Sequence, residues 1–213
     1  MKKSIAGLVL AVSLVLSGCN FESSIEKQLS NAMTEMNSAE KEYRNAQTEL
    51  TELEKSEQKL FNETMELTKE QRDELEAKVT ELEGSLEQRL THLEEEEESI
   101  SRARDSADEL DAIIEQADEK DKKSIETLKT ATTNRYELHA VFVAEYKKLI
   151  AEQKELYEML VSEETGLTDL KNKVSEVNAQ NELVQSAITA YNDATAKMNV
   201  LKDDVFTSLQ KEK

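Results

Sequence analysis

The sequence predicts an all-α protein, an elongated up-and-down bundle of four long helices. The 213 residues include no proline and no tryptophan, and Glu, Lys, Leu, Ala and Gln dominate, which is a helix-forming composition. Apolar or small residues recur at alternating steps of four and three, the heptad seam of coiled-coil-like packing. Interruptions divide the chain into four similar segments, each predicted to form a helix roughly 60–75 Å long.

The N-terminus is predicted to be an export leader. Lys2-Lys3 precedes an apolar run over residues 5–16, which is twelve residues, whereas a membrane-spanning helix needs about 20. A basic start, a short apolar core and the lipobox Leu16, Ser17, Gly18 before Cys19 are typical of a bacterial lipoprotein signal. We therefore expect residues 1–18 to be removed.

Cys19 is the single cysteine of the chain and is the predicted lipidation site. Its nucleophilic sulfur would carry a diacylglyceryl thioether, and two or three acyl chains, palmitate among them, give a stable anchor. An ordinary secretory signal is the alternative, but it would leave a free thiol in an oxidising compartment. The sequence thus predicts attachment to the cell membrane at its extracytoplasmic face.

Residues 19–23 form a short tether, and residues 24–213 are predicted to form one helical bundle domain. Ser23-x-x-Glu26 is a capping box that indicates the first helix start. Glu57 and Thr64 are polar exceptions in the seam that follows. The other seam residues are Ile25, Leu29, Ala32, Met36, Ala39, Tyr43, Ala46, Leu50, Leu53, Leu60 and Leu67.

A second capping box, Thr68-x-x-Gln71, predicts a break near residues 66–68. In the next seam Arg89 and Glu96 occupy two positions without interrupting the phase. Its apolar members are Leu75, Val79, Leu82, Leu86, Leu93, Ile100, Ala103, Ala107, Leu110, Ile114 and Ala117.

The third and fourth helices follow two further interruptions. Residues 118–123 are six consecutive charges, where we expect a turn with Asp121 or Ser124 as the helix cap. The alternative is a three-helix bundle in which one continuous helix crosses this segment. The second interruption lies at residues 162–166, because Gly166 suits the position just past a helix end.

Charge and motifs restrict the possible functions. The net charge is −19, and removing the leader takes away two lysines and no acids, which leaves −21. Such a charge disfavours nucleic acid as a partner and repels anionic wall polymers unless divalent cations bridge the two. His92 and His139 belong to no HExxH or ExxH motif, and there is no Gly-rich phosphate loop. We therefore expect that the protein is not an enzyme and that it binds no metal and no cofactor.

Six polar seam residues are predicted at comparable heights near the middle of the bundle. We interpret them as a structural layer that sets the helix register. The alternative is a site for a small ligand or anion between the helices. The six residues are Tyr43, Arg89, Glu96, Arg135, His139 and Tyr191.

With its lipobox, Leu16-Ser17-Gly18-Cys19, and its proline-free acidic helices, the chain resembles the YkyA-like cell-wall-binding lipoproteins of Gram-positive bacteria. The resemblance covers the whole precursor, and the lipobox is its one sharp motif. It implies a long helical bundle on the outer face of the cytoplasmic membrane. It supplies no catalytic residue, and Cys19 is the one residue to which it assigns a role.

Three functions follow from these observations. The leading hypothesis is a non-catalytic envelope protein that contacts peptidoglycan or a wall-associated protein from its distal end, near residues 66–68 and 162–166. The alternative is a regulatory or chaperone-like adaptor for a membrane or secreted protein, working through its helix faces. A third is a ligand sensor that uses the polar layer.

Overall fold

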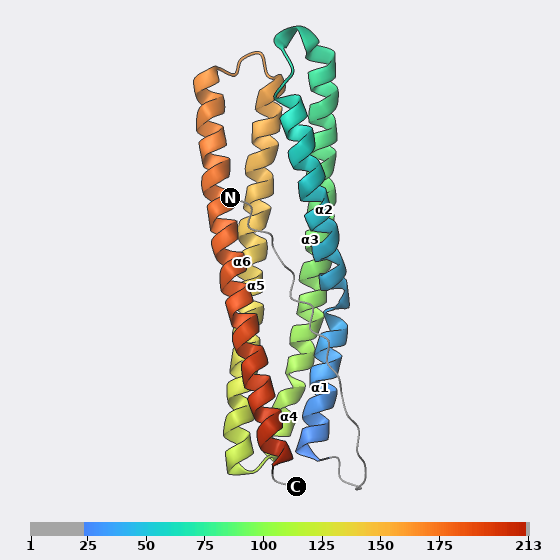
Figure 1. Ribbon diagram of the computed structural model, residues 1–213, viewed down its shortest axis with the longest axis vertical. Coiled ribbons are helices and arrows are strands. Elements are labelled where there is room, and N and C mark those ends of the chain that lie inside the picture. Colours follow the sequence, from blue (N-terminus) through green and yellow to red (C-terminus); the bar gives the residue numbers. More distant parts are fainter. Residues whose placement is uncertain (1–23, 212–213) are drawn as a thin grey trace.

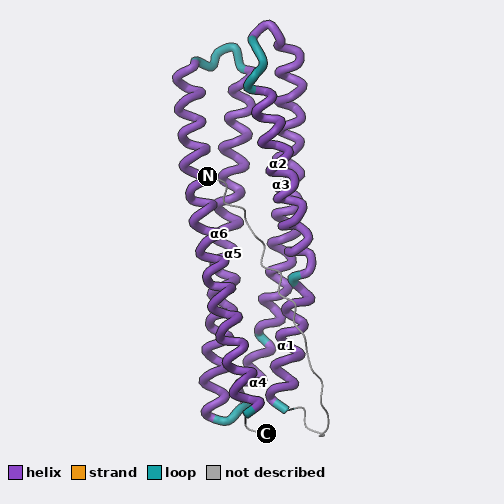
Figure 2. The backbone as a smooth tube through the Cα atoms, in the orientation of Figure 1, coloured by secondary structure: helices purple, strands orange, loops and turns teal. Residues whose placement is uncertain are grey.

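The computed structural model describes residues 24–211 as an elongated all-α bundle (Figure 1). In Figure 2 long helices are joined by short connections, and this part of the chain holds no strand. The fold class predicted from the sequence is confirmed. The elements are α1 (Ile25–Ala39), α2 (Lys41–Thr64), η1 (Lys69–Gln71), α3 (Arg72–Ala107), α4 (Glu109–Gln116), α5 (Glu119–Val161) and α6 (Leu167–Gln210).

These elements form four antiparallel legs: α1 with α2, α3 with α4, α5, and α6 (Figure 1). The chain reverses between α4 and α5, which excludes the three-helix alternative. Ala117 is extended there, with ψ of 152°, and the Asp118 carboxylate accepts hydrogen bonds from the N–H groups of Lys120 and Asp121. Asp118 is therefore the cap, in place of the predicted Asp121 or Ser124, because its side chain reaches the first free amides of α5.

The other helix boundaries lie close to the predicted ones. Thr68 and Gln71 form the predicted capping box, at the start of η1. Ser24 caps α1 by accepting from the Lys27 N–H at 3.3 Å, whereas the predicted capping residue, Ser23, lies outside the described residues. Gly166 marks the predicted interruption, but it begins α6 with a φ of −82° and does not close α5.

Two ends of the bundle can be distinguished (Figure 1). At the proximal end the start of α1, the α4–α5 turn and the end of α6 lie together, and Gln28 donates to Gln116 across this end at 3.2 Å. At the distal end lie η1 and the connection over residues 162–166. Since α5 has 43 residues, the two ends are about 65 Å apart.

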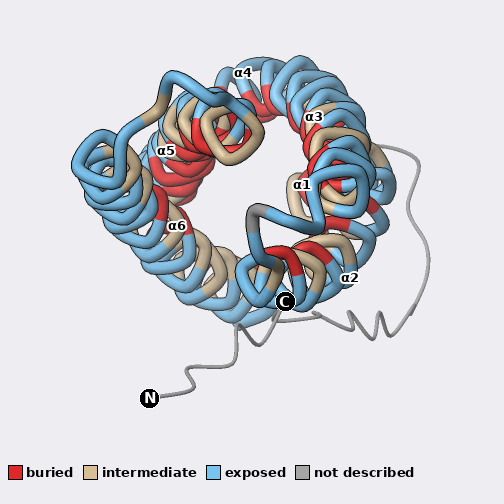
Figure 3. The backbone as a smooth tube through the Cα atoms, turned by 90° about the horizontal axis from the view of Figure 1, so that it is seen from above, coloured by how far each residue is buried: buried red, intermediate tan, exposed pale blue. Residues whose placement is uncertain are grey.

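The buried faces of the helices point inward (Figure 3) and form two apolar clusters. The proximal cluster includes Leu29, Leu110 and Leu128, and the distal cluster includes Leu82, Leu93 and Val184. Along its length α6 packs on α5, and near the proximal end it also meets α1. No Cα atoms of α2 and α6 come within 8 Å, and Figure 3 shows α6 running obliquely, away from α2 at its distal end.

A kink at Glu40 separates α1 from α2 and has an identifiable cause. The Ser99 hydroxyl donates to the Ala39 carbonyl at 2.6 Å and accepts from the Tyr43 N–H at 3.0 Å. These two backbone groups are the partners that would bond to each other in a regular helix. A side chain inserted into this ladder bends the helix, and the bend aims Glu40 into the bundle.

Candidate functional site

The first candidate site is a mid-bundle cluster built around Glu96 and His139. Glu96 of α3 is 0% exposed, and its two oxygens lie 2.7 Å from Nε2 of His139 and 2.6 Å from Nε2 of Gln47, which donates to it. His139 itself is 2% exposed. Every carboxylate oxygen of Glu96 thus has a partner, as a buried charge requires. These contacts tie α3 to α2 and α5.

Arg135 of α5 lies in the same cluster and bonds both to Glu40 at the kink and to two side chains of α6. Its guanidinium donates to both carboxylate oxygens of Glu40 at 2.6 and 3.0 Å, to the Tyr191 hydroxyl at 2.5 Å and to Thr195 at 2.9 Å. The Tyr136 hydroxyl donates to Glu40 at 3.1 Å. Burial opposes the charge on Arg135, yet Tyr191 and Glu40 raise its pKa. The bidentate geometry is the strong form of a carboxylate–guanidinium pair.

Aromatic rings complete the mid-bundle cluster. The ring of His139 lies 5.7 Å from that of Tyr43 and 5.3 Å from that of Tyr191, both edge to face. The Arg135 guanidinium lies 4.9 Å from the centre of the Tyr191 ring. Burial raises the pKa of Tyr43 to about 12 and also raises the pKa of Tyr191 and Tyr136. These phenols are therefore neutral hydrogen-bonding groups at physiological pH.

The structure brings five of the six predicted layer residues together and separates the sixth, Arg89. Glu96, Arg135 and His139 share the mid-bundle cluster with the two tyrosines. Arg89 lies seven residues before Glu96 on α3, which is about 10.5 Å along the axis. The prediction of one height for all six is therefore wrong for Arg89 by about two helical turns, because heptad spacing does not show how far one helix is offset along another.

Arg89 belongs to a second, distal cluster around Glu57. It donates to Glu57 at 2.8 Å, to the Tyr146 hydroxyl at 2.9 Å and to Gln153 at 3.0 Å. Glu57 is 3% exposed and also accepts from Ser85 at 2.9 Å. Tyr146 and Glu57 come from α5 and α2, which share no backbone contact, so this cluster connects these two helices through side chains alone.

Two tyrosines extend the distal cluster. Tyr157 donates to Glu57 at 2.8 Å, and Tyr146 donates to Glu54 at 2.6 Å. Burial raises the pKa of both phenols. Burial also opposes the charge on Arg89, while Tyr146 and Glu57 raise its pKa. Both clusters thus hold a guanidinium against a carboxylate among tyrosines, and each of their carboxylates and guanidiniums has hydrogen-bond partners.

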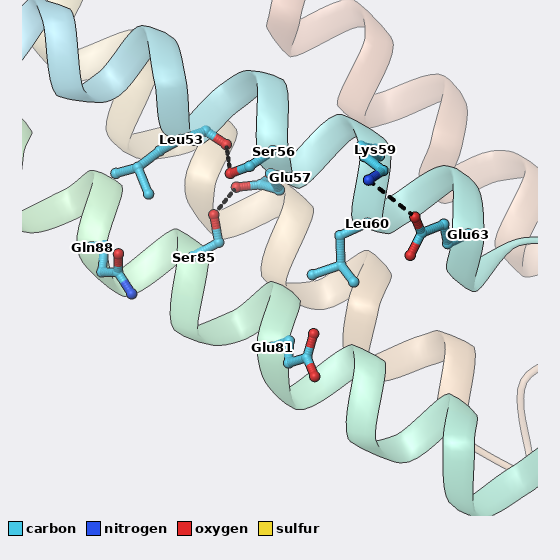
Figure 4. A pocket seen from close by; sticks show the side chains of 9 residues that line it. All are labelled: Leu53, Ser56, Glu57, Lys59, Leu60, Glu63, Glu81, Ser85 and Gln88. Carbon is cyan, nitrogen blue, oxygen red and sulfur yellow. Dashed lines mark hydrogen bonds and ion pairs between the residues drawn. The ribbon is translucent and has the colours of Figure 1, made fainter.

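A surface groove of about 420 Å³ runs between α2 and α3 beside the distal cluster. Figure 4 shows Glu57 and Ser85 bonded to each other across it, with Lys59 paired to Glu63. Leu53 and Leu60 line its wall. The Glu57 carboxylate in the groove already accepts hydrogen bonds from Ser85, Arg89 and Tyr157. Both of its oxygens therefore have donors within the protein.

Charge is distributed unevenly over the helices. Residues 72–116, which form α3 and α4, carry sixteen acidic and five basic residues. In contrast, α5 carries eight of each sign, and α6 carries six acidic and four basic residues. The α5–α6 hairpin is therefore close to neutral on a strongly acidic molecule. The α3–α4 side of the bundle therefore repels anionic polymers far more strongly than the α5–α6 side does.

Sequence reasoning missed several residues of the two clusters. Glu57 was visible as a polar exception in the seam but was not assigned to the layer. Glu40 occupies no seam position and turns inward because of the kink. Ser85 and Ser99 are buried, at 8% and 0% exposure, yet a serine carries no signal that distinguishes a buried bridge from a solvated surface.

The remaining predictions concern the N-terminus and metal binding. Cys19 and the lipobox residues Leu16, Ser17 and Gly18 lie outside the described residues. Within residues 24–211, no group of three or more His, Cys, Asp or Glu side chains is arranged to hold a metal ion. Over the same residues, no helix is both long and apolar enough to cross a membrane.

The fold and its clusters define a class of protein: a long four-leg helical bundle with two hydrogen-bonded polar clusters in its core. Residues 24–208 match the model of the YkyA family, described as "putative cell-wall binding lipoprotein". The match covers most of the chain, and the chain belongs to this family. The resemblance drawn from its sequence is thereby confirmed.

Two known proteins are similar to this chain. The uncharacterized lipoprotein YkyA of Bacillus subtilis (strain 168) is 26% identical over 123 residues, which is 57% of this chain and 55% of that protein. The match therefore spans about half the length of this relative. A Staphylococcus aureus protein of unknown function has a crystal structure with a TM-score of 0.72 at 19% identity, covering 85% of this chain and 91% of that one. This second likeness establishes the fold alone.

Proposed function

We propose that this protein is a non-catalytic lipoprotein, anchored through Cys19 at the extracytoplasmic face of the membrane, whose bundle contacts the cell wall. The family description supports a lipoprotein with a wall-binding role. The leader, residues 1–18, and the lipobox Leu16, Ser17 and Gly18 support export and lipidation. Peptidoglycan or a wall-associated protein is the proposed partner.

The position of the start of α1 carries this proposal. Ser24 caps α1 five residues after Cys19, at the same end as the α4–α5 turn and the end of α6 (Figure 1). A lipid on Cys19 would hold this proximal end against the bilayer. The distal end, with η1 and residues 162–166, would then stand about 65 Å away. A stalk of this kind suits contact with material beyond the membrane.

Lipidation is tested by growing cells that express the full chain with radiolabelled palmitate. The wild-type protein is expected to take up the label and to sediment with membranes, whereas a Cys19→Ser variant should do neither. Equal labelling of both proteins would disprove Cys19 as the lipidation site.

Wall binding is tested by co-sedimentation of the purified lipoprotein, in detergent, with wall sacculi over a range of Mg²⁺ concentrations. We expect retention on the sacculi, with Mg²⁺ strengthening it where anionic polymers are still attached, because the cation bridges two negative partners. Absence of retention at every Mg²⁺ concentration would refute direct wall binding.

A second candidate function is an adaptor for a basic membrane or secreted protein, and the charge of α3 and α4 favours it. Residues 94–98 are five consecutive glutamates, and four of them are exposed. A surface of one sign steers an oppositely charged partner. Crosslinking in intact cells followed by mass spectrometry separates the adaptor function from direct wall binding, since an adaptor yields one protein partner and direct wall binding yields glycan.

A further inference from the structure

One face of α6 carries a row of carboxamide side chains. Their spacing of three, four, seven and seven residues places them on a single face of the helix. We call this row the amide stripe. It consists of Asn178, Asn181, Gln185, Asn192 and Asn199.

Neighbouring contacts locate the amide stripe on the bundle. Lys173 and Gln180 face α5, where they bond to Glu152 and Glu145 respectively. Val184 is buried in the core. Asn181 and Gln185 each come one residue after an inward-facing position, about 100° around the helix, so the stripe lies on one flanking edge of α6 and not on its α5-facing side. This edge borders the side of the bundle where α2 and α6 have no backbone contact, and where α6 diverges distally (Figure 3).

Four of the five stripe amides are available for binding. Asn178, Asn181, Gln185 and Asn192 are exposed, and none of their side chains hydrogen-bonds to another described residue. Nδ2 of Asn199 is buried without a partner. The exposed members, from Asn178 to Asn192, span about 21 Å, which suits a linear polymer better than a small ligand.

The stripe is also nearly uncharged on a molecule of net charge −19. Among residues 177–192 the single charged residue is Glu182. On α3, by comparison, ten of the eighteen exposed positions are aspartate or glutamate. Val174, 39% exposed, lies four residues before Asn178 and adds an apolar contact to the same edge. This edge combines amide donors and acceptors with apolar side chains.

We propose that the amide stripe binds an uncharged, N-acetylated glycan strand, an inference that rests on the wall-binding function proposed above. Each carboxamide offers two N–H donors and a carbonyl acceptor, which match the hydroxyl and N-acetyl groups of such a strand. The near-neutral α5–α6 hairpin lets a glycan approach without repulsion. The acidic α3–α4 side repels anionic polymers by its like charge.

The test introduces three carboxylates into the stripe, with Asn178→Asp, Asn181→Asp and Gln185→Glu in one variant. A matched control places the same charge on the outer face of α6, through Asn172→Asp, Ala179→Asp and Ser186→Asp. All six positions are exposed. A neutral variant, with alanine at the three stripe positions, removes the amides and favours the helix. Each full-length lipoprotein is co-sedimented with acid-treated sacculi that lack anionic polymers.

We expect both stripe variants to raise the apparent Kd for sacculi at least tenfold, while the outer-face control stays within about threefold of wild type, since several hydrogen bonds are lost only in the stripe variants. Helicity and melting temperature should match wild type in all of them. Equal binding by the alanine variant, or equal weakening in the control, would overturn the stripe as the site. Failure of the wild-type protein to bind sacculi would instead refute the wall-binding function itself.

Discussion

Replacing Arg89 by methionine removes a guanidinium that donates to Glu57, Tyr146 and Gln153. The Glu57 carboxylate is then left 3% exposed with a negative charge and two remaining donors, the hydroxyls of Ser85 and Tyr157. Breaking a buried ion pair costs about 3–5 kcal/mol. Because two donors remain, we expect Arg89→Met to lower the free energy of unfolding by about 3 kcal/mol, near the lower limit of this range.

The complementary variant, Glu57→Met, leaves Arg89 buried with Tyr146, Gln153 and a distant carboxylate of Glu54 at 3.9 Å. We expect a similar cost of about 3 kcal/mol. In the double variant no charge is left unpaired. Its cost comes mainly from the Ser85 and Tyr157 hydroxyls, which lose an acceptor, at about 1 kcal/mol each.

The two single effects sum to about 6 kcal/mol, whereas the double variant is expected to cost about 2–3 kcal/mol, so the coupling energy is about 3 kcal/mol. Urea unfolding followed by circular dichroism at 222 nm measures all four free energies of unfolding. An unchanged dependence on urea concentration shows that the same structure unfolds in each variant.

A matched exposed pair on the same two helices serves as the control. Lys78 and Glu63 lie 2.9 Å apart with side chains 21% and 45% exposed, and their methionine cycle should give a coupling of less than about 1 kcal/mol. Additivity within about 0.5 kcal/mol for Arg89 and Glu57 would show that the distal cluster does not act as a buried charge pair.

Three further predictions concern the kink, the tyrosines and α6. Ser99→Ala should destabilise the fold by about 1–3 kcal/mol and speed hydrogen exchange at the Tyr43 amide, because Ala39 and Tyr43 lose their bridge; unchanged exchange would contradict this cause of the kink. Burial raises the pKa of all five tyrosines, to about 12 for Tyr43. The stability that the protonated phenols provide is complete below about pH 10 and falls as the pH rises through the folded pKa, so an absorbance titration that ionises half the tyrosines at pH 10 in the folded protein would refute their burial. Native-state exchange should be faster over residues 170–184 of α6, where the α6 backbone approaches no helix but α5, than over residues 191–209, and uniform protection would refute this difference.

The helices and their inward faces could be predicted from the sequence because both depend on local spacing. Leu29, Leu82 and Leu93 occur in the apolar series and are all buried in the structure. Glu96 and His139 interrupt the same series and are also buried, at 0% and 2% exposure. The turn positions could be predicted for the same reason, because a charge run, Gly166 and a capping box mark them within a few residues of chain.

The partners of those inward residues could not be predicted in the same way. A seam shows that Arg89 and Glu96 point into the bundle, but it does not show how far one helix is shifted along another. Each residue of shift moves a side chain by about 1.5 Å along the helix axis. A shift of two turns is therefore much longer than a hydrogen bond, and for this reason Arg89 was predicted in the wrong cluster. The kink at Glu40 depends on Ser99, which lies 60 residues from the carbonyl that it bonds.

By itself the sequence determined that this protein is a proline-free, acidic bundle of long helices, since composition and heptad spacing act within a few residues of chain, and it predicts a lipoprotein leader. Only the tertiary structure decided which charges pair, into a mid-bundle and a distal cluster, and which edge of α6 remains free. The reason is physical: pairing depends on the relative offset and tilt of helices, and these follow from the packing of the whole bundle.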